Sequence, residues 1–100
     1  MSEPPTANDN DRPREFLEIE LTVPQYRALM KFKYVDPFQR AQLECAQPVD
    51  ATGEFVLVRI EAYLAEMLVG DLAYVINRSK LSPRILLLNE VADAFELALK

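Results

Sequence analysis

Carboxylates are the residues of this chain that offer acid–base chemistry, because the sequence contains no histidine. Histidine is the commonest general base and the commonest zinc ligand, so its absence removes both roles together. Glu18 and Glu20 lie two residues apart in a segment that alternates like a strand, which places both on one face. General acid–base catalysis needs a carboxyl group whose pKa is raised by an apolar pocket. Nothing in the alternation indicates burial of either glutamate, so we assign no catalytic and no metal-ligating residue.

Asp71 is the carboxylate in the more unusual setting. On a continuous helix its neighbours at three and four positions include Met67, Leu68 and Val75, so Asp71 is predicted on the apolar face. A carboxylate there must be paired, hydrogen-bonded or protonated. Alternatively, Gly70 ends one helix and Asp71 caps the next, or the side chain lies at the rim. The first setting is typical of a functional carboxylate, and the others are structural.

Basic and aromatic side chains gather in one neighbourhood of a chain whose formal net charge is −5. The residues predicted to bind a partner are Arg27, Lys31, Lys33, Tyr34 and Arg40. Clustered cations in an acidic protein favour an anion or an acidic partner segment, although a solvated helix face has the same composition. Tyr26 belongs to the neighbourhood but has the spacing of a core residue. A second basic group, for which helix-dipole interactions are the simpler interpretation, consists of Arg78, Lys80 and Arg84.

Cys45 is the only cysteine, so no intrachain disulfide can form, and a reducing compartment is expected. With no histidine to activate its thiol, Cys45 is predicted to be a small buried hydrophobic side chain. The only glycines are Gly53 and Gly70, so the chain has no glycine-rich phosphate loop. We therefore expect no cofactor.

The composition excludes several classes of protein. One hundred residues, half of them apolar and 27% charged, are typical of one globular domain. The net negative charge disfavours nucleic acid as the main partner, because phosphate contacts need clustered Lys and Arg. The apolar stretches are too short or too interrupted to span a bilayer, and the first residues lack the pattern of a secretory signal. A cytoplasmic location is the resulting expectation.

The elements that position these residues begin after a polar leader. Residues 1–14 lack apolar periodicity and are predicted to be a disordered tail, which leaves residues 15–100 as a single domain. A strand is predicted from about Glu15 to Val23, with alternate Leu and Ile residues on a covered face. Thr22 or Val23 ends this strand, and Pro24 fits the first turn of a helix.

The next helix is predicted to begin at Asp36-Pro37, with the apolar stripe Phe38, Ala41 and Cys45. Residues 42–46 fit the end of this helix or a strand that pairs with the next one. A second strand spans 54–60. A long helical pattern follows it, with the apolar residues Tyr63, Leu64, Met67, Leu68, Leu72, Val75 and Ile76. Ser82-Pro83 then opens the last helix. Its buried stripe is predicted to be Ile85, Leu88, Ala92, Phe95 and Leu99.

The predicted architecture is α+β, in the order β-α-α-β-α-α, with two strands, or three if 42–46 pairs, covered by about four helices. Residues 15–29 and 54–68 both begin Glu-Phe and run from a strand into a helix, which suggests a β-α-α repeat, although any such junction looks similar. A two-stranded sheet leaves open edges. Either helices cover them or two chains join into a homodimer, for which Leu86 and Leu97 offer a second contact surface.

The absence of catalytic equipment favours a non-enzymatic protein-interaction or regulatory module, which binds a protein partner or self-associates into a homodimer. Its binding surface is predicted around Lys31–Arg40 or on the last helix. The alternative is a small enzyme or enzyme-accessory subunit that uses a partly buried Asp71 with Tyr74. A weak single-strand nucleic-acid binder is a third hypothesis, because such proteins combine cations with stacking rings.

Overall fold

The structure, a computed structural model, describes residues 15–100; the predicted disordered tail lies outside the described residues. The elements in chain order are β1 (Phe16–Thr22), α2 (Val23–Met30), α3 (Pro37–Leu43), β2 (Gln47–Pro48), β3 (Phe55–Glu61), α4 (Ala62–Arg78) and α5 (Pro83–Leu99). Helices and a small sheet therefore share this part of the chain, and the predicted α+β class and element order are confirmed, with β2 as the added third strand.

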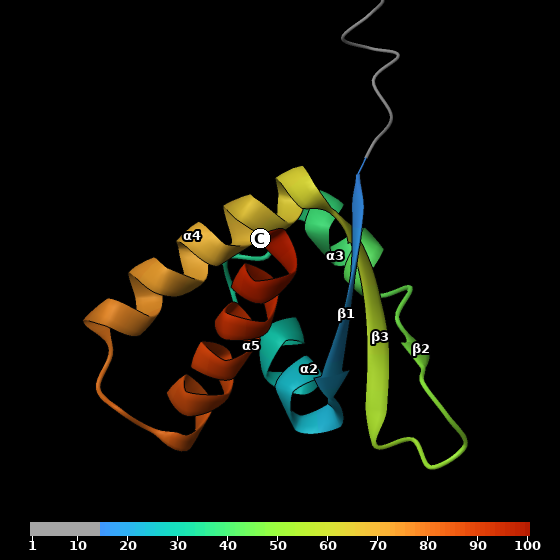
Figure 1. Ribbon diagram of the computed structural model, residues 1–100. Coiled ribbons are helices and arrows are strands. Elements are labelled where there is room, and N and C mark those ends of the chain that lie inside the picture. The colour runs from blue at the N-terminus through green and yellow to red at the C-terminus, as the bar shows by residue number, and fades with distance from the viewer. Residues whose placement is uncertain (1–14) are drawn as a thin grey trace, which may run out of the picture.

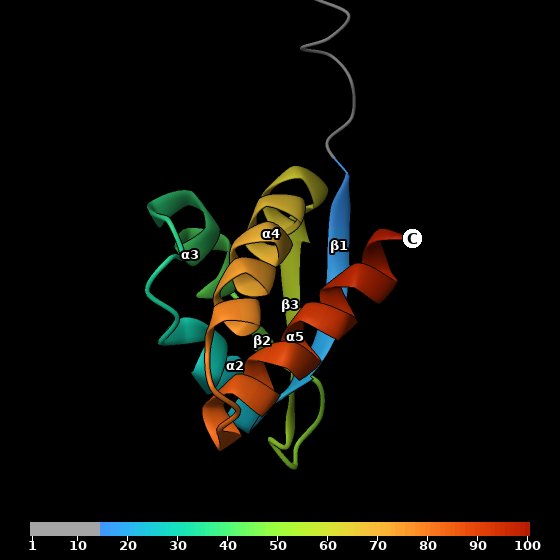
Figure 2. The ribbon, with the colours of Figure 1, turned by 90° about the vertical axis from the view of Figure 1, so that its left-hand side faces the viewer.

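The sheet has the strand order β1-β3-β2, and both neighbouring pairs are antiparallel. Figure 1 shows the sheet nearly edge-on, with α2, α4 and α5 on one of its faces. In Figure 2 these helices lie in front of the strands, β1 forms one edge, and α3 lies on the opposite side of the molecule, beyond β3. One face of the sheet is thus covered by helices, and α3 flanks the sheet on the β2 side.

The two long strands alternate as the sequence predicts. Ile19 pairs with Val58, and both side chains are buried beneath the helices. Glu18 pairs with Arg59 on the outer face, so these two charged residues are neighbours across the strands. The guanidinium carbon of Arg59 lies 4.0 Å from the ring centroid of Phe16. A strict period of two therefore separates a covered apolar face from an outer face that carries both charged and apolar side chains.

Each of the two long strands passes directly into a helix, because the residue that ends the strand is also the N-cap of the helix. Thr22 ends β1 and accepts a hydrogen bond from the backbone N–H of Gln25 at 3.2 Å, while the Gln25 side chain accepts one from Thr22 N–H at 2.9 Å. This is a capping box, and Pro24 occupies the first turn of α2. Glu61 likewise ends β3 and precedes the first residue of α4.

The predicted caps of the other two helices are confirmed. Asp36 accepts a hydrogen bond from Gln39 N–H at 2.8 Å, with Pro37 as the first helical residue of α3. Ser82 Oγ accepts one from Ile85 N–H at 3.2 Å, with Pro83 opening α5. Side-chain oxygens thus satisfy N–H groups that the first turn of a helix leaves without partners.

The core lies between the sheet and the helices. Its largest fully buried side chains are Phe32, Phe95, Leu21, Leu29, Leu43, Ile60, Leu68, Leu72, Leu88, Gln39, Val58 and Val91. On α5 the buried stripe follows the predicted spacing through Leu88 and Phe95, whereas Leu86 and Leu97 are exposed. The last helix is therefore amphipathic in the predicted sense.

The predicted buried stripe of α3 is wrong. Phe38 is 74% exposed, and Ala41 and Cys45 are exposed as well. The buried residues of α3 are Gln39 and Leu43, and Gln39 is only 1% exposed. Its side-chain amide donates a hydrogen bond to the backbone oxygen of Leu64 at 3.2 Å, so a polar residue occupies the inward face without an unpaired group. Cys45 is consequently not the buried hydrophobe that the sequence suggested.

Residues 42–46 contain the end of a helix rather than a strand. Helix α3 ends at Leu43, a turn follows at residues 44–45, and the third strand is the later pair Gln47–Pro48. The loop after it contains Gly53, whose φ of 71° lies in the left-handed region. Such a φ strains residues that carry a Cβ atom, which explains glycine at this turn.

Asp71 is exposed on an unbroken α4. The helix continues through Gly70, so Asp71 is neither a cap nor a member of the buried face. The buried residues of α4 are Leu64, Ala65, Leu68 and Leu72. The predicted apolar pattern was wider than the covered stripe, because it also counted Tyr63 and Met67, which are exposed. Asp71 lies among these exposed residues.

Candidate functional site

The residues predicted to bind a partner lie in three different settings. Lys33 and Tyr34 follow α2 in the turn before α3, where the Lys33 ammonium lies 5.3 Å from the centroid of the Tyr34 ring. The Arg40 guanidinium donates a hydrogen bond to the backbone oxygen of Met30 at 3.1 Å, which ties α3 to the end of α2. Arg40 therefore has a structural partner within the fold.

The remaining two cations of that prediction, Arg27 and Lys31, line a hollow of about 330 Å³ between α2 and α5. Arg84 from the second basic group completes its lining, together with apolar groups from both helices. The structure thus combines residues of two basic groups that the sequence analysis treated separately. Binding of an acidic segment by these cations stays a prediction.

Tyr26 also has a partner inside the fold. Its hydroxyl donates a hydrogen bond to the backbone oxygen of Leu43 at 2.8 Å, which links α2 to the end of α3. Burial raises the pKa of the Tyr26 phenol above its usual range, and the negative charge of Glu44 adds to the effect. The neutral phenol is therefore the form that the folded state favours.

The outward face of α3 carries exposed apolar side chains near the sheet. We call Phe38, Ala41 and Cys45, which follow one another at three and four positions, the α3 ridge. These three side chains are exposed: Phe38 and Ala41 form a stripe on α3, and Cys45 continues it in the turn after the helix. Periodicity did identify this stripe as apolar, but it could not show that the stripe faces outward.

A hollow of about 670 Å³, the helix hollow, lies on one side of the α3 ridge. It is lined by Pro37, Phe38, Ala41, Gln42, Glu61, Tyr63 and Leu64. Tyr63, at the start of α4, is 68% exposed and adds a second aromatic ring to Phe38. Tyr63 was not predicted as a surface residue, because the helical pattern placed it in the buried stripe of α4.

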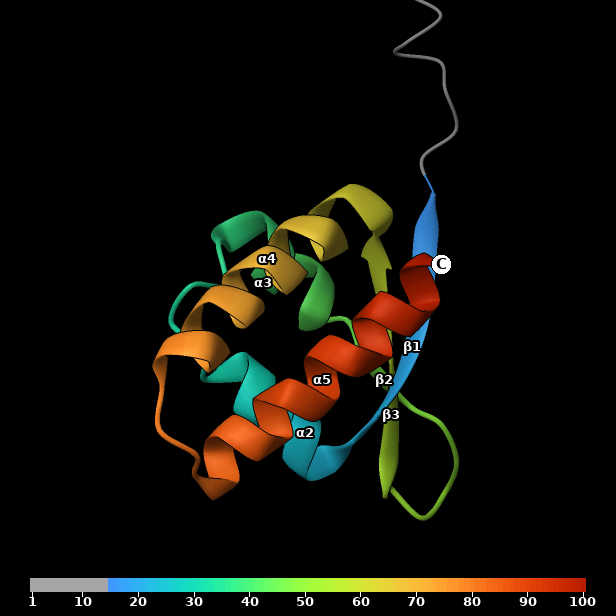
Figure 3. The ribbon, with the colours of Figure 1, turned by 60° about the vertical axis from the view of Figure 1, so that its left-hand side comes forward.

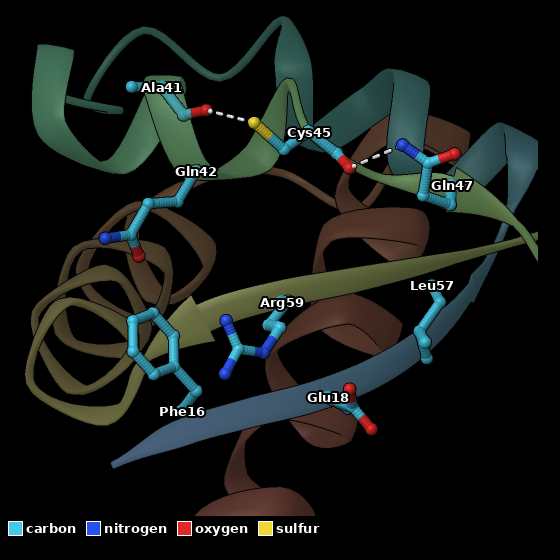
Figure 4. Close-up of a pocket in the computed structure, with 8 residues that line it drawn as sticks. All are labelled: Phe16, Glu18, Ala41, Gln42, Cys45, Gln47, Leu57 and Arg59. Carbon is cyan, nitrogen blue, oxygen red and sulfur yellow. Dashed lines mark hydrogen bonds between the residues drawn. The ribbon is translucent and has the colours of Figure 1, made fainter. Parts of the chain in front are cut away.

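A second hollow, of about 440 Å³, lies on the other side of the ridge, between α3 and the outer face of the sheet. Figure 4 shows its lining residues, which are Phe16, Glu18, Ala41, Gln42, Cys45, Gln47, Leu57 and Arg59. We call it the sheet hollow. Arg59 points toward the Phe16 ring, and Cys45 Sγ donates to the backbone oxygen of Ala41 at 3.4 Å (Figure 4).

Two glutamine side chains fix the position of the α3 ridge. Gln39 reaches inward to the backbone of Leu64, and Gln42 is hydrogen-bonded to both the backbone and the side chain of Glu61. Helix α3 is therefore attached to the β3–α4 junction through polar contacts, while its apolar ridge faces outward. An exposed apolar stripe between two hollows is a feature that contact surfaces often have.

The lining of the two hollows combines apolar side chains with glutamine and charged side chains. Among residues 15–100, no group of three or more His, Cys, Asp or Glu side chains is arranged to hold a metal ion. None of the helices in this range combines the length and the apolar character required to cross a membrane. Asp71, the carboxylate of the enzymatic hypothesis, is exposed on α4 and lines neither hollow beside the ridge. Comparison of the chain with protein-family models, with curated proteins and with solved structures finds no match in any of the three.

Proposed function

We propose that this domain is a non-enzymatic protein-interaction module that self-associates into a homodimer through the α3 ridge. The observation that carries the proposal is the position of Phe38, which is 74% exposed and borders a hollow of about 670 Å³ lined in part by its own helix. The same face of the chain therefore contains both a projecting ring and a hollow that could receive such a ring.

Two-fold symmetry is the reason for choosing a second copy as the occupant. In a dimer with a two-fold axis, the same patch is used on both subunits, so each patch must contain a projection and the recess that receives it. Phe38 is the projection and the helix hollow is the recess. The ring of each copy would then enter the hollow of the other, beside Tyr63.

Burial of the exposed rings provides the driving force. Full burial of one large apolar side chain contributes roughly 1.5–3 kcal/mol, and Phe38 and Tyr63 both start from exposed positions. Buried aromatic residues near the centre of an interface commonly dominate its energy. The proposal therefore places the largest effects at Phe38 and Tyr63 rather than at the charged residues around them.

The test is light scattering coupled to size-exclusion chromatography over a range of protein concentrations. The wild type should approach twice the monomer mass as the concentration rises, and Phe38→Ser should stay monomeric. Leu97→Ser is the matched control, because Leu97 is 73% exposed on α5, nearly the same as Phe38, but lies outside both hollows. Leu97→Ser should dimerise like the wild type.

Two outcomes would refute the proposal. A wild type that stays monomeric at the highest attainable concentration would exclude the homodimer. Loss of dimerisation in Leu97→Ser but not in Phe38→Ser would move the interface to α5, the other surface that the sequence analysis suggested. An enzymatic role for Asp71 gains no support from its exposed position, so we do not propose it.

A further inference from the structure

Among residues 15–100, no strand pairs with the outer edge of β1. At the two ends of the β1–β3 ladder, Ala62 N–H donates to Glu15 O at 2.8 Å and Val23 N–H donates to Glu54 O at 3.1 Å. Backbone groups in an antiparallel pair alternate between facing the partner strand and facing away from it. The odd-numbered residues of β1 therefore face β3, and the N–H and C=O groups of Phe16, Glu18 and Glu20 point away from β3.

Within residues 15–100 the sheet ends at β1. Figure 1 shows β1 in front of β3, and Figure 2 shows it as the last strand on one side. The fourth outward N–H group, that of Thr22, is already bonded to the Gln25 side chain in the capping box of α2. The open part of the edge is therefore the stretch from Phe16 to Glu20, where an added strand would find a regular series of donors and acceptors.

Charge selects the kind of strand that this edge accepts. Glu18 and Glu20 are exposed on the outer face of β1, and across the β1–β3 ladder Glu18 faces Arg59 whereas Glu20 faces Leu57. Antiparallel pairing of β1 with β1 of a second copy would bring glutamates opposite or next to glutamates, and like charges in such positions repel. A strand with Lys or Arg at alternate positions would instead form opposite-charge pairs.

The inner side of the edge is apolar. In Figures 2 and 3 the C-terminal end of α5 extends across the sheet as far as β1 and past its edge. Ala94 and Ala98 lie one helical turn apart and are partly buried, and Leu97 beside them is 73% exposed. Leu17, Ile19 and Leu21 lie on the covered face of β1, and the exposed Leu97 offers a further apolar side chain on α5. The residues between the cations of the added strand should therefore be apolar.

We infer that β1 accepts an extended segment of a partner protein, with alternating cationic and apolar residues, as a further strand at the Phe16–Glu20 edge. The cations of the segment face Glu18 and Glu20, and its apolar residues lie beneath the end of α5. This recognition uses backbone hydrogen bonds for affinity and alternate side chains for specificity. It is independent of the α3 ridge, which lies on the β2 side of the sheet.

Amide hydrogen exchange, measured by NMR on the full chain, tests the inference. In the free protein the amides of Phe16, Glu18 and Glu20 should exchange fast, while those of Leu17, Ile19 and Leu21 are protected by β3. The probe is a capped peptide of alternating lysine and valine. Its addition should slow exchange at Phe16, Glu18 and Glu20 by about tenfold or more, because local protection follows the formation of backbone hydrogen bonds.

Matched peptides and a charge-reversed variant separate strand addition from general attraction of opposite charges. The same peptide with proline at its centre keeps the charge but loses a backbone donor, and it should protect these amides far less. A peptide of alternating glutamate and valine should give no protection to the wild type. In the double variant Glu18→Lys/Glu20→Lys, which changes two exposed side chains, the preference between the acidic and the basic peptide should reverse.

Unchanged exchange at Phe16, Glu18 and Glu20 in the presence of the lysine–valine peptide would overturn the inference. Equal protection by the proline-containing peptide would overturn it as well, because attraction between charges would then explain the binding. The Phe38→Ser variant should bind the peptide like the wild type. Failure of the homodimer and failure of strand addition are therefore distinguishable, since scattering reports the first and amide exchange the second.

Discussion

Gln42 and Glu61 are joined by two hydrogen bonds. The side-chain amide of Gln42 donates to Glu61 Oε1 at 2.9 Å, and Gln42 Oε1 accepts from the backbone N–H of Glu61 at 2.8 Å. Glu61 ends β3, and its N–H faces the side of the sheet where β2 is too short to reach it. A side chain of α3 thus replaces the missing strand and attaches the helix to the sheet.

Replacement of Gln42 by alanine should lower the free energy of unfolding by about 1–3 kcal/mol, since removal of one partner leaves a partly buried N–H without its acceptor. The measurement is urea denaturation followed by circular dichroism. Gln47→Ala is the control: Gln47 is exposed, donates a 3.4 Å hydrogen bond to Cys45 O, and should change stability by less than about 0.5 kcal/mol. Equal stability of the two variants would contradict this role of Gln42.

Tyr26 should make the stability of the protein depend on alkaline pH. Burial raises the pKa of its phenol above the ordinary value of 10.0, so the unfolded chain releases this proton at a lower pH than the folded protein. The resulting stabilisation is complete below about pH 10 and is lost as the pH rises through the folded-state pKa. Urea midpoints of the wild type should therefore fall across this alkaline range.

Tyr26→Phe isolates this effect, because the variant and the wild type share every other ionisable group. At neutral pH the variant should be less stable by about 0.5–1.5 kcal/mol, since it lacks the hydrogen bond to Leu43 O. The difference between variant and wild type should shrink above about pH 10. A difference that stays constant with pH would show that the phenol titrates alike in the folded and unfolded states.

Truncation of a side chain should lower stability much more on the buried face of α5 than on its exposed face. Phe95→Ala removes a fully buried ring and should lower the free energy of unfolding by about 3–5 kcal/mol. Leu97→Ala alters a side chain that is 73% exposed and should change it by less than about 0.5 kcal/mol. Thermal or urea unfolding of both variants gives the comparison. A large loss in Leu97→Ala would show that this face is covered in solution.

Cys45 should react with a thiol reagent such as Ellman's reagent without denaturant, because its side chain is exposed. Reaction only in urea would show that Cys45 is buried, as the periodicity suggested. If the α3 ridge is the dimer contact, the rate should fall as the protein concentration rises, since Cys45 belongs to the ridge. In Phe38→Ser the rate should not depend on protein concentration.

Local signals in the sequence were sufficient to predict much of the fold. Strict alternation at Leu17, Ile19 and Leu21 determines the inner face of β1, because a shift by one residue would expose all three side chains. Asp36-Pro37 and Ser82-Pro83 determine two helix starts, because capping depends on residues within one turn. These features depend on neighbours in the chain and are therefore visible without the tertiary structure.

The outward orientation of the α3 ridge could not be predicted without the tertiary structure. A helix of seven residues offers two competing stripes, one with Phe38 and Ala41 and the other with Gln39 and Leu43. Hydrophobicity favours the first, but the Leu64 carbonyl, 25 residues along the chain, provides the partner that lets Gln39 be buried. Propensity and periodicity contain no information about such a distant acceptor.

The hollow between α2 and α5 and the strand β2 also depend on contacts between distant segments of the chain. Arg84 joins Arg27 and Lys31 only because α5 packs beside α2. Strand β2 has two residues, too few for an alternating pattern, and the Val49 N–H to Phe55 O bond of 3.0 Å supports its pairing with β3. Contacts between distant segments, rather than the residue types themselves, create both features.

The direct passage from strand to helix at Thr22–Val23 and at Glu61–Ala62 limits where the chain can be lengthened. A residue inserted at either point would rotate the following helix by about 100° and shift its capping residue. The loop at residues 49–54 has no such constraint, because its side chains are exposed and neither of its ends caps a helix. A fluorescent tag or a sensor peptide inserted there should leave the α3 ridge and the β1 edge in their positions, so this loop is the natural attachment point for reporters of both contacts.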